Sequence, residues 1–301
     1  MPEPKKTFKS GFVAVVGRPN AGKSTLVNSL VGEKVSIVTP VAQTTRNRIL
    51  GIVHRPEAQV VLMDTPGIHR PLSRLNEQMM TFVREALAER DLALLIADAS
   101  VPFGKGDEFA VQLVADHAPR SILLLNKIDK VHKPKLLPLI DQYAKLHNFE
   151  EIFPISALKG AGLREVLEAV IARLPDGPAY FPEDIYTDQP ERFLATEIVR
   201  EYVIRNTQKE LPHASAVLME KFEESDTITR IHAAILVERD SQKPIVIGAG
   251  GSRIKQIGTE ARLELEKIFP PKVFLQLFVR VEPHWRENNS LIAELDYRNE
   301  G

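Results

Sequence analysis

The most constraining feature of this sequence is an eight-residue loop, residues 17–24, which reads GRPNAGKS and fits the pattern G-x-x-x-x-G-K-S. An apolar run, residues 12–16, precedes the loop, and a helical pattern follows it. Glycines in such a loop let backbone N–H groups turn toward a phosphate, while the lysine reaches the outer phosphates and the serine binds Mg²⁺. The pattern therefore predicts a strand, a phosphate-binding loop and a helix in succession.

The rest of the first half of the chain alternates short apolar runs with amphipathic stretches. The runs are residues 60–63, 92–97, 122–125 and 152–155, and they are rich in Val, Ile and Leu. Apolar runs without polar alternation, separated by helices, are typical of a parallel sheet that is covered on both faces. We therefore expect an α/β domain with a mostly parallel sheet and helices on both faces.

A second motif, Asp64-Thr65-Pro66-Gly67, follows the apolar run 60–63. At the carboxyl end of a strand, the Asp64 carboxylate can hold Mg²⁺ through water, and the N–H of Gly67 can meet a terminal phosphate. The predicted phosphate-binding residues are Gly17, Arg18, Pro19, Asn20, Ala21, Gly22, Lys23, Ser24, Thr25 and Gly67.

Base selection is predicted from Asn126-Lys127-Ile128-Asp129, directly after the run 122–125. Guanine offers two neighbouring donors that one carboxylate can accept, and adenine has no such pair, so Asp129 would select GTP. Asn126 would tie the loop together, and the stem of Lys127 could lie along the base. Ser156, Ala157 and Leu158, after the fifth run, lie where a backbone N–H could meet guanine O6.

These four motifs resemble those of the translation-factor-like branch of the P-loop GTPases, over residues 11–175. The resemblance implies a guanine-nucleotide switch that hydrolyses GTP with Mg²⁺. It places switch I at Gln43, Thr44, Thr45, Arg46 and Asn47, and switch II at Asp64, Thr65, Pro66, Gly67 and Ile68. The implied Mg²⁺ ligands are Ser24, Thr45 and Asp64.

One position departs from the Ras-like pattern, because Ile68 stands where those enzymes have a glutamine that orients the attacking water. Isoleucine can neither orient water nor accept a proton. Catalysis would then rest on Lys23, Mg²⁺ and backbone donors, and it should be slow without help. In related GTPases the asparagine of the phosphate loop, here Asn20, helps to hold a K⁺ ion, so we expect K⁺ to stimulate turnover.

A proline-rich segment, residues 175–190, interrupts any regular element and is predicted to be a linker between residues 1–174 and 191–301. After it, the pattern predicts a helix at 191–208, strands at 216–222 and 231–238, a glycine loop, a helix at 252–269 and a last strand at 273–281. We expect the order α-β-β-α-α-β, an α+β domain.

The glycine loop of this second domain fits I-G-x-x-G-x-x-I and resembles the loop of the prokaryotic-type KH domain. That resemblance implies that a nucleic-acid backbone lies against the loop and the start of the next helix, with unstacked bases in a neighbouring apolar groove. The implied RNA-binding residues are Lys243, Ile247, Gly248, Ala249, Gly250, Gly251, Ser252, Arg253, Ile254 and Lys255.

Charge limits how such a domain can bind RNA. The net charge of the chain is −1, and it divides into +4 for residues 1–180 and −5 for residues 181–301. Residues 239–255 carry four basic side chains and one acidic one, a local +3. Coating of nucleic acid by bulk electrostatics is thus excluded, and we expect affinity for RNA to depend modestly on salt. The chain has no cysteine, which excludes disulfides and thiolate metal sites.

A GTPase domain followed by a single KH domain resembles the Era family of bacterial GTPases, and the resemblance extends to residues 181–184 in the linker. It implies a monomer that binds single-stranded RNA near the 3′ end of small-subunit ribosomal RNA and assists assembly of the small ribosomal subunit. It also implies peripheral association with the inner membrane. The apolar runs are too short for a membrane span and the N-terminal residues have no apolar core like that of a signal peptide, so we expect a cytoplasmic protein. Two alternatives stay open: a GTPase that serves tRNA modification, and a passive RNA adapter in which GTP is structural.

Overall fold

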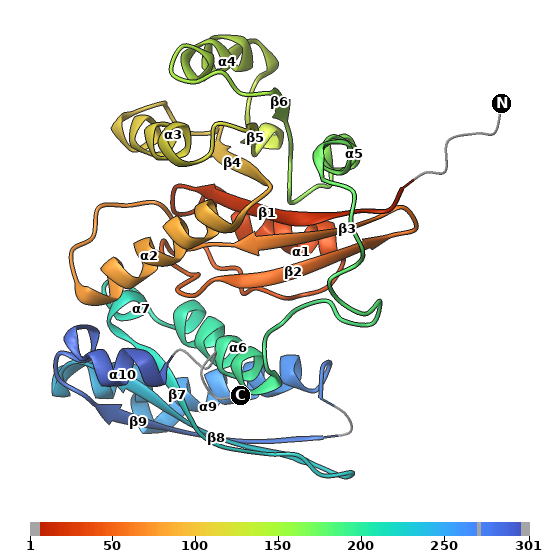
Figure 1. The fold of residues 1–301 in the computed structure, drawn as a ribbon. Helices are drawn as coiled ribbons and strands as arrows, with labels where there is room; N and C mark the ends of the chain where they lie inside the picture. The colour runs from red at the N-terminus through yellow and green to blue at the C-terminus, as the bar shows by residue number, and fades with distance from the viewer. Residues whose placement is uncertain (1–6, 270–271, 296–301) are drawn as a thin grey trace. The chain divides into compact units, whose positions relative to one another are not determined.

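The computed structural model describes residues 7–269 and 272–295. The chain forms two compact units (Figure 1). Unit 1 contains the residues up to Ser36, Thr45–Pro71 and Asn76–Asp188, whereas unit 2 contains Ile37–Thr44, Leu72–Leu75 and the residues from Gln189 onward. Among the described residues, no helix is both long enough and apolar enough to cross a membrane.

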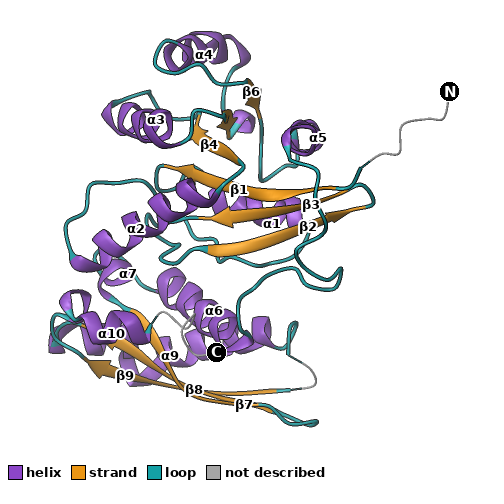
Figure 2. Ribbon diagram, viewed as in Figure 1, coloured by secondary structure: helices purple, strands orange, loops and turns teal. Residues whose placement is uncertain are grey.

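Unit 1 is built on a six-stranded sheet with the order β2-β3-β1-β4-β5-β6 (Figure 2). Its strands are β1 Lys9–Gly17, β2 Ile49–Arg55, β3 Ala58–Asp64, β4 Leu92–Asp98, β5 Ser121–Asn126 and β6 Glu151–Pro154. All neighbouring strands are parallel except β2, which pairs antiparallel with β3. The predicted mostly parallel sheet is confirmed, and β2 is the strand that the sequence analysis missed.

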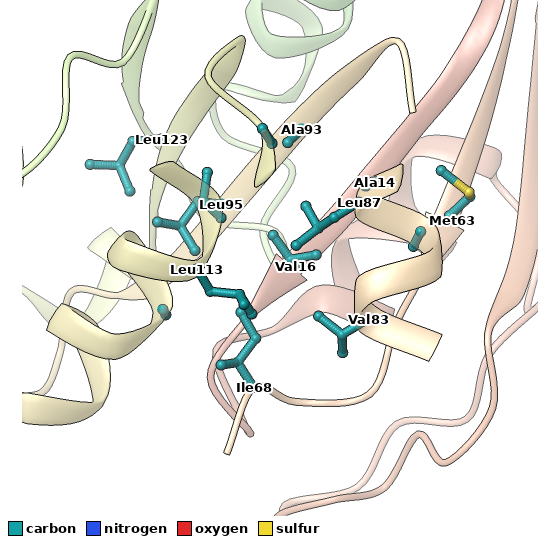
Figure 3. Packing of buried hydrophobic residues seen from close by; sticks show 14 of the residues in the cluster. Ala14, Val16, Met63, Ile68, Val83, Leu87, Ala93, Leu95, Leu113 and Leu123 are labelled. Carbon is teal, nitrogen blue, oxygen red and sulfur yellow. The ribbon is translucent and has the colours of Figure 1, made fainter. Parts of the chain in front are cut away.

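Helices cover both faces of this sheet, as alternation along β1 shows. Ala14 and Val16 belong to one buried cluster, which also contains side chains of α2 Arg74–Glu89 and α3 Lys105–His117 (Figure 3). The intervening residues, Val13 and Val15, belong to a second cluster with side chains of α1 Lys23–Val31 and α5 Leu163–Arg173. Successive residues of a strand point to opposite faces, so a strand with layers on both faces is apolar throughout.

The predicted linker packs against unit 1 over much of its length. The buried side chain of Gln59, on β3, donates to the carbonyl of Phe181 at 2.7 Å and accepts from the N–H of Tyr180 at 2.7 Å. Along β2, the N–H of Ile52 donates to the carbonyl of Tyr186 at 2.9 Å. This segment therefore satisfies backbone groups at the edge of the sheet.

Unit 2 contains a three-stranded sheet, β7-β8-β9, with β7 and β8 antiparallel and β8 and β9 parallel. The strands are β7 Ala216–Glu223, β8 Thr229–Val237 and β9 Val273–Val281. The helices are α6 Glu191–Asn206, α7 Leu211–Ala214, α8 Lys243–Ile247, α9 Ser252–Leu265 and α10 Asn289–Glu294. The predicted α+β order is confirmed, with α7 and α10 as additions to it.

Candidate functional site

Two glycines set the shape of the loop between β1 and α1. A Cβ atom at Gly17 would lie 2.2 Å from the carbonyl oxygen of Ile96, and one at Gly22 would lie 2.2 Å from the amide nitrogen of Asn126. Both contacts are far closer than any side chain tolerates, and Gly22 also has a left-handed φ of 103°. The Asn126 amide uses this space to donate to the carbonyl of Ala21 at 2.8 Å.

Lys23 is held inside the loop by the loop's own backbone. Its Nζ donates to the carbonyl oxygens of Gly17 and Arg18 at 3.2 and 3.1 Å, and its side chain is buried. Burial lowers the pKa of Lys23 to about 8, although the nearby charge of Asp64 acts in the opposite direction. Both hydrogen-bond acceptors of this buried ammonium are neutral carbonyls, so an anionic phosphate would add a charge-assisted partner.

Asp64, at the end of β3, is fully buried, and neither of its carboxylate oxygens has a hydrogen-bond partner among the described residues. Burial raises the pKa of Asp64, while the nearby Ser24 hydroxyl and the Lys23 charge oppose this effect. The hydroxyl oxygens of Ser24 and Thr45 lie 2.8 Å apart. A buried carboxylate without a partner and two adjacent hydroxyl groups form an oxygen donor set that fits Mg²⁺.

The residues after Asp64 lie against the phosphate loop. A Cβ atom at Gly67 would come within 2.6 Å of the Pro19 ring, so only glycine permits this approach. The N–H of Ile68 donates to the carbonyl of Gly17 at 2.9 Å, and the hydroxyl of Thr65 donates to the carbonyl of Val15 at 2.8 Å. Pro66, between them, is buried.

The side chain of Ile68 belongs to the hydrophobic core. It is 3% exposed and lies in the same buried cluster as Val16, Val83 of α2 and Leu113 of α3 (Figure 3). Burial of this side chain contributes about 1.5–3 kcal/mol to stability. In this conformation the side chain at residue 68 is a core residue and presents almost no surface to solvent.

The candidate guanine loop is joined to its neighbours by three side chains. Asn126 accepts from the N–H of Ala157 at 2.9 Å, and the hydroxyl of Ser156 donates to Asp129 at 2.6 Å. Lys127 donates to the carbonyl of Asn20 at 2.7 Å and pairs with Asp98 at 2.5 Å. Asp98 is the last residue of β4 and was not predicted as part of the site. Its position at the carboxyl end of a parallel strand could have indicated it.

Other predicted residues of this site occupy less enclosed positions. Leu158 is 71% exposed, and Asn20 is exposed with a positive φ of 63°. In switch I, Gln43 also has a positive φ, of 61°, and the hydroxyl of Thr44 donates to the carbonyl of Val41 at 2.7 Å. Two further switch I residues, Arg46 and Asn47, are half-buried, and Thr25 belongs to α1.

In unit 2, a glycine turn joins α8 to α9. Gly248, Gly250 and Gly251 all have positive φ values, of 76°, 55° and 80°. A Cβ atom at Gly248 would lie 2.8 Å from the backbone nitrogen of Arg253, whereas added Cβ atoms at Gly250 and Gly251 would meet nothing. Only the first glycine is required by close packing, and the exposed surface of the turn is open to a ligand.

The predicted RNA-binding side chains around this turn differ in their positions. Lys243, Ala249, Ser252 and Lys255 are exposed, and Ile247 and Ile254 are half-buried. Arg253 instead folds back and donates to the carbonyl of Ile245 on α8. The two lysines therefore carry their charges at the surface of the turn, whereas Arg253 stabilises the turn itself.

A groove of about 370 Å³ lies beside this turn, between α9 and β9. It is lined by Ile254, Lys255, Gly258, Thr259, Arg262, Phe274, Leu275, Gln276 and Leu277. Phe274, an aromatic residue of this lining, is 44% exposed. Only Ile254 and Lys255 of this lining were predicted. The other seven residues were missed, because the sequence does not show that α9 packs beside β9 or which residues then face the groove.

Family comparisons place two modules on the chain. Residues 12–127 match a family described as 50S ribosome-binding GTPase, and residues 210–286 match the KH domain family. The GTPase Era of Syntrophus aciditrophicus is 46% identical over 292 residues, which cover 96% of this chain and 95% of that protein. The GTPase Era of Staphylococcus haemolyticus is 42% identical over 290 residues, with coverage of 96% and 97%.

Solved structures agree with these matches. A crystal structure of Era in complex with MgGDPNP and nucleotides 1506–1542 of 16S ribosomal RNA matches with a TM-score of 0.91 and 42% identity. The match covers 96% of this chain and 99% of that chain. An Aquifex aeolicus Era variant bound to GDP and aluminium fluoride also matches with a TM-score of 0.91 and 42% identity.

Burial of Ile68 leads to a prediction for Ile68→Gln, the change that would restore the Ras-like residue. The amide would enter an apolar cluster without a partner, so the free energy of unfolding should fall by about 2–4 kcal/mol. GTP hydrolysis should not accelerate. Denaturant unfolding and single-turnover hydrolysis check this, with Ile68→Val as the control. Faster hydrolysis at unchanged stability would mean that residue 68 faces the nucleotide.

Proposed function

The chain belongs to the Era family of GTPases, and from that premise we propose that it is a GTP-hydrolysing switch that binds single-stranded ribosomal RNA and assists assembly of the small ribosomal subunit. The main support is the groove between α9 and β9, beside a glycine turn, in a chain that matches an Era–RNA complex over 96% of its length. The RNA in that complex is the segment 1506–1542 of 16S ribosomal RNA, and we propose the corresponding segment as the ligand here.

In the nucleotide site, we propose that the backbone of residues 17–25 and Gly67 bind the phosphates. Lys23 would neutralise the outer phosphates, since its ammonium is already buried and held at the loop. Asp129 would accept from both donors of the guanine base, with Ser156 donating to Oδ1 and fixing the orientation of the carboxylate. Asn126 would join the loop that binds the phosphates to the loop that follows β6 and lies at the base.

The donor set for Mg²⁺ consists of Ser24, Thr45 and Asp64. When bound, Mg²⁺ would neutralise charge on the phosphates. The chain's own residues do the rest: Thr45 brings switch I to Ser24, and the buried Asp64 carboxylate, which has no hydrogen-bond partner among the described residues, favours a cation. The structure of a relative with MgGDPNP supports this assignment.

Hydrolysis would proceed without a side chain to orient water at residue 68, and we propose a slow intrinsic rate. Charge that develops on the transferred phosphoryl group would be met by Lys23 and backbone N–H groups. Asn20, which is exposed at the tip of the loop, would help to hold a K⁺ ion that adds a further positive charge.

The order of the chain suggests how the nucleotide would influence RNA binding. Thr45 belongs to unit 1, whereas the preceding segment Ile37–Thr44 belongs to unit 2 with the KH domain. Within unit 2, Arg200 of α6 donates to the carbonyl of Thr44 and Arg205 donates to the carbonyl of Val38 at 3.2 Å. We propose that switch I carries the nucleotide state to the KH-containing unit through this segment.

Three further assignments remain proposals. We propose a GTPase domain at residues 1–174, a linker at 175–190 and a KH domain at 191–301, and the two family matches lie inside the first and last of these. The small ribosomal subunit as partner and a peripheral contact with the cytoplasmic face of the membrane rest on the resemblance to the Era family.

Replacement of Asp129 tests the guanine assignment. Asp129→Asn should shift preference from guanosine to xanthosine nucleotides, because an amide can pair with the extra carbonyl of xanthine but cannot accept both guanine donors. Competition between labelled GDP and XDP measures the shift. The control Asp116→Asn, on an exposed face of α3, should bind as the wild type does. An unchanged GDP preference would contradict the assignment.

A change of monovalent cation tests the proposal for Asn20. Hydrolysis should be faster in K⁺ than in Na⁺ at equal ionic strength, since only the larger ion would fit a site built for K⁺, and Asn20→Ala should abolish the difference. Steady-state phosphate release is the measurement. Equal hydrolysis rates in both salts would contradict the K⁺ proposal without affecting the assignment as a GTPase.

Substitution in the groove tests RNA binding. Phe274→Ala should weaken affinity for a single-stranded RNA with the sequence of the 1506–1542 segment by roughly tenfold, given a stacking contribution of about 1–3 kcal/mol per base. Leu263→Ala, which removes an exposed apolar side chain of α9 outside the groove, is the control. The salt slope should be shallow, about −2 for three neutralised phosphates. Unchanged binding by Phe274→Ala, or a steep salt slope, would contradict this mode of recognition.

A further inference from the structure

A buried carboxylate that is not part of the nucleotide site lies beside the phosphate loop and is bonded to one of its residues. Asp107, in the first turn of α3, is 5% exposed, and its two oxygens accept three hydrogen bonds. Arg18 donates to Oδ2 at 2.6 Å, the N–H of Gly104 donates to Oδ2 at 3.1 Å, and the Tyr143 hydroxyl donates to Oδ1 at 2.9 Å. Since a buried carboxylate is stable only when it is well paired, these contacts explain why Asp107 is tolerated.

The packing around this carboxylate is built for the arginine. A Cβ atom at Gly106 would lie 2.6 Å from Nε of Arg18, so the guanidinium rests directly on the first turn of α3. On the other side, Tyr143 of α4 (Leu136–Ala144) is buried and its ring meets Phe103 edge-on, with centroids 5.0 Å apart. Burial and the Asp107 charge raise the pKa of Tyr143, so this hydroxyl remains a donor.

Arg18 belongs to the phosphate loop, and its backbone takes part in the site. Its carbonyl accepts from Lys23 at 3.1 Å, and the next residue, Pro19, closely approaches Gly67 of switch II. Movement of the Arg18 backbone would therefore displace both the lysine and the switch contact. The side chain of Arg18 is the link from this backbone to a rigid helix.

We propose that Asp107 is a positioning residue for nucleotide binding, which acts through Arg18 to hold the phosphate loop against α3. The proposal rests on the nucleotide site assigned above. A loop that is already held in its binding conformation loses less entropy when the nucleotide binds, so its complex dissociates more slowly. The ion pair is charge-assisted and shielded on the carboxylate side, which makes it stronger than an exposed pair.

A double-mutant cycle tests the proposal by the dissociation rate of a fluorescent GDP analogue from the full chain. Asp107→Asn places an amide where the guanidinium needs an acceptor, and it should accelerate dissociation by about tenfold. Arg18→Ala should have a similar effect, and the double variant should dissociate no faster than either single variant. Asp116→Asn, which alters an exposed carboxylate on the same helix that accepts a hydrogen bond from Gln112, is the matched control and should dissociate like the wild type.

An unchanged dissociation rate for Asp107→Asn would overturn the proposal. The proposal would also fail if Asp107→Asn accelerated dissociation as much in the Arg18→Ala variant as it does in the wild type, because Asp107 would then act independently of Arg18. If a thermal melt shows that Asp107→Asn does not fold, Arg18→Gln replaces it, because Arg18 is the more exposed partner of the pair. Arg18→Gln should still accelerate dissociation about tenfold, and an unchanged rate would again overturn the proposal. If Asp107→Asn leaves dissociation unchanged while Asp129→Asn still changes base preference, the proposed nucleotide site remains valid and only the role of Asp107 is contradicted.

Discussion

The nucleotide site depends on one close approach, in which the amide of Asn126 occupies the space that a Cβ atom at Gly22 would need. From there the amide donates to Ala21 of the phosphate loop and accepts from Ala157 of the loop after β6. One side chain thus joins the loop for the phosphates to the loop for the base. Any side chain at residue 22 would displace this amide, and the start of α1, with Lys23, would lose its fixed position.

Much of the site follows from local sequence, because each of its motifs directly follows a buried strand. The carboxyl ends of parallel strands meet at one edge of a sheet, so Asp64 and Asn126 are brought to the phosphate loop by topology alone. β2 was missed although it is as long as β3 and β4, because Gly51 interrupts its apolar run. That glycine has a packing role, since a Cβ atom there would lie 2.7 Å from Val27 of α1.

Other features could not be predicted, because they depend on contacts between distant parts of the chain. Asp107 and Arg18 are 89 residues apart, and nothing in the pattern of α3 indicates that its first turn receives an arginine. The burial of Ile68 likewise follows from the packing of α2 and α3 on the sheet. In unit 2 the glycine turn was predicted from its motif, whereas Phe274 entered the site only when β9 packed beside α9.

The central claim is that the GTP-bound chain presents a short, weakly charged groove to ribosomal RNA, even though residues 181–301 have a net charge of −5. Cross-linking of the full chain to cellular RNA, with GTP or GDP bound, followed by sequencing of the captured RNA, tests this most directly. The account predicts enrichment of the 3′ segment of small-subunit ribosomal RNA in the GTP-bound form and its loss in the GDP-bound form. Equal capture in both forms, or capture of unrelated RNAs without enrichment of that segment, would contradict it.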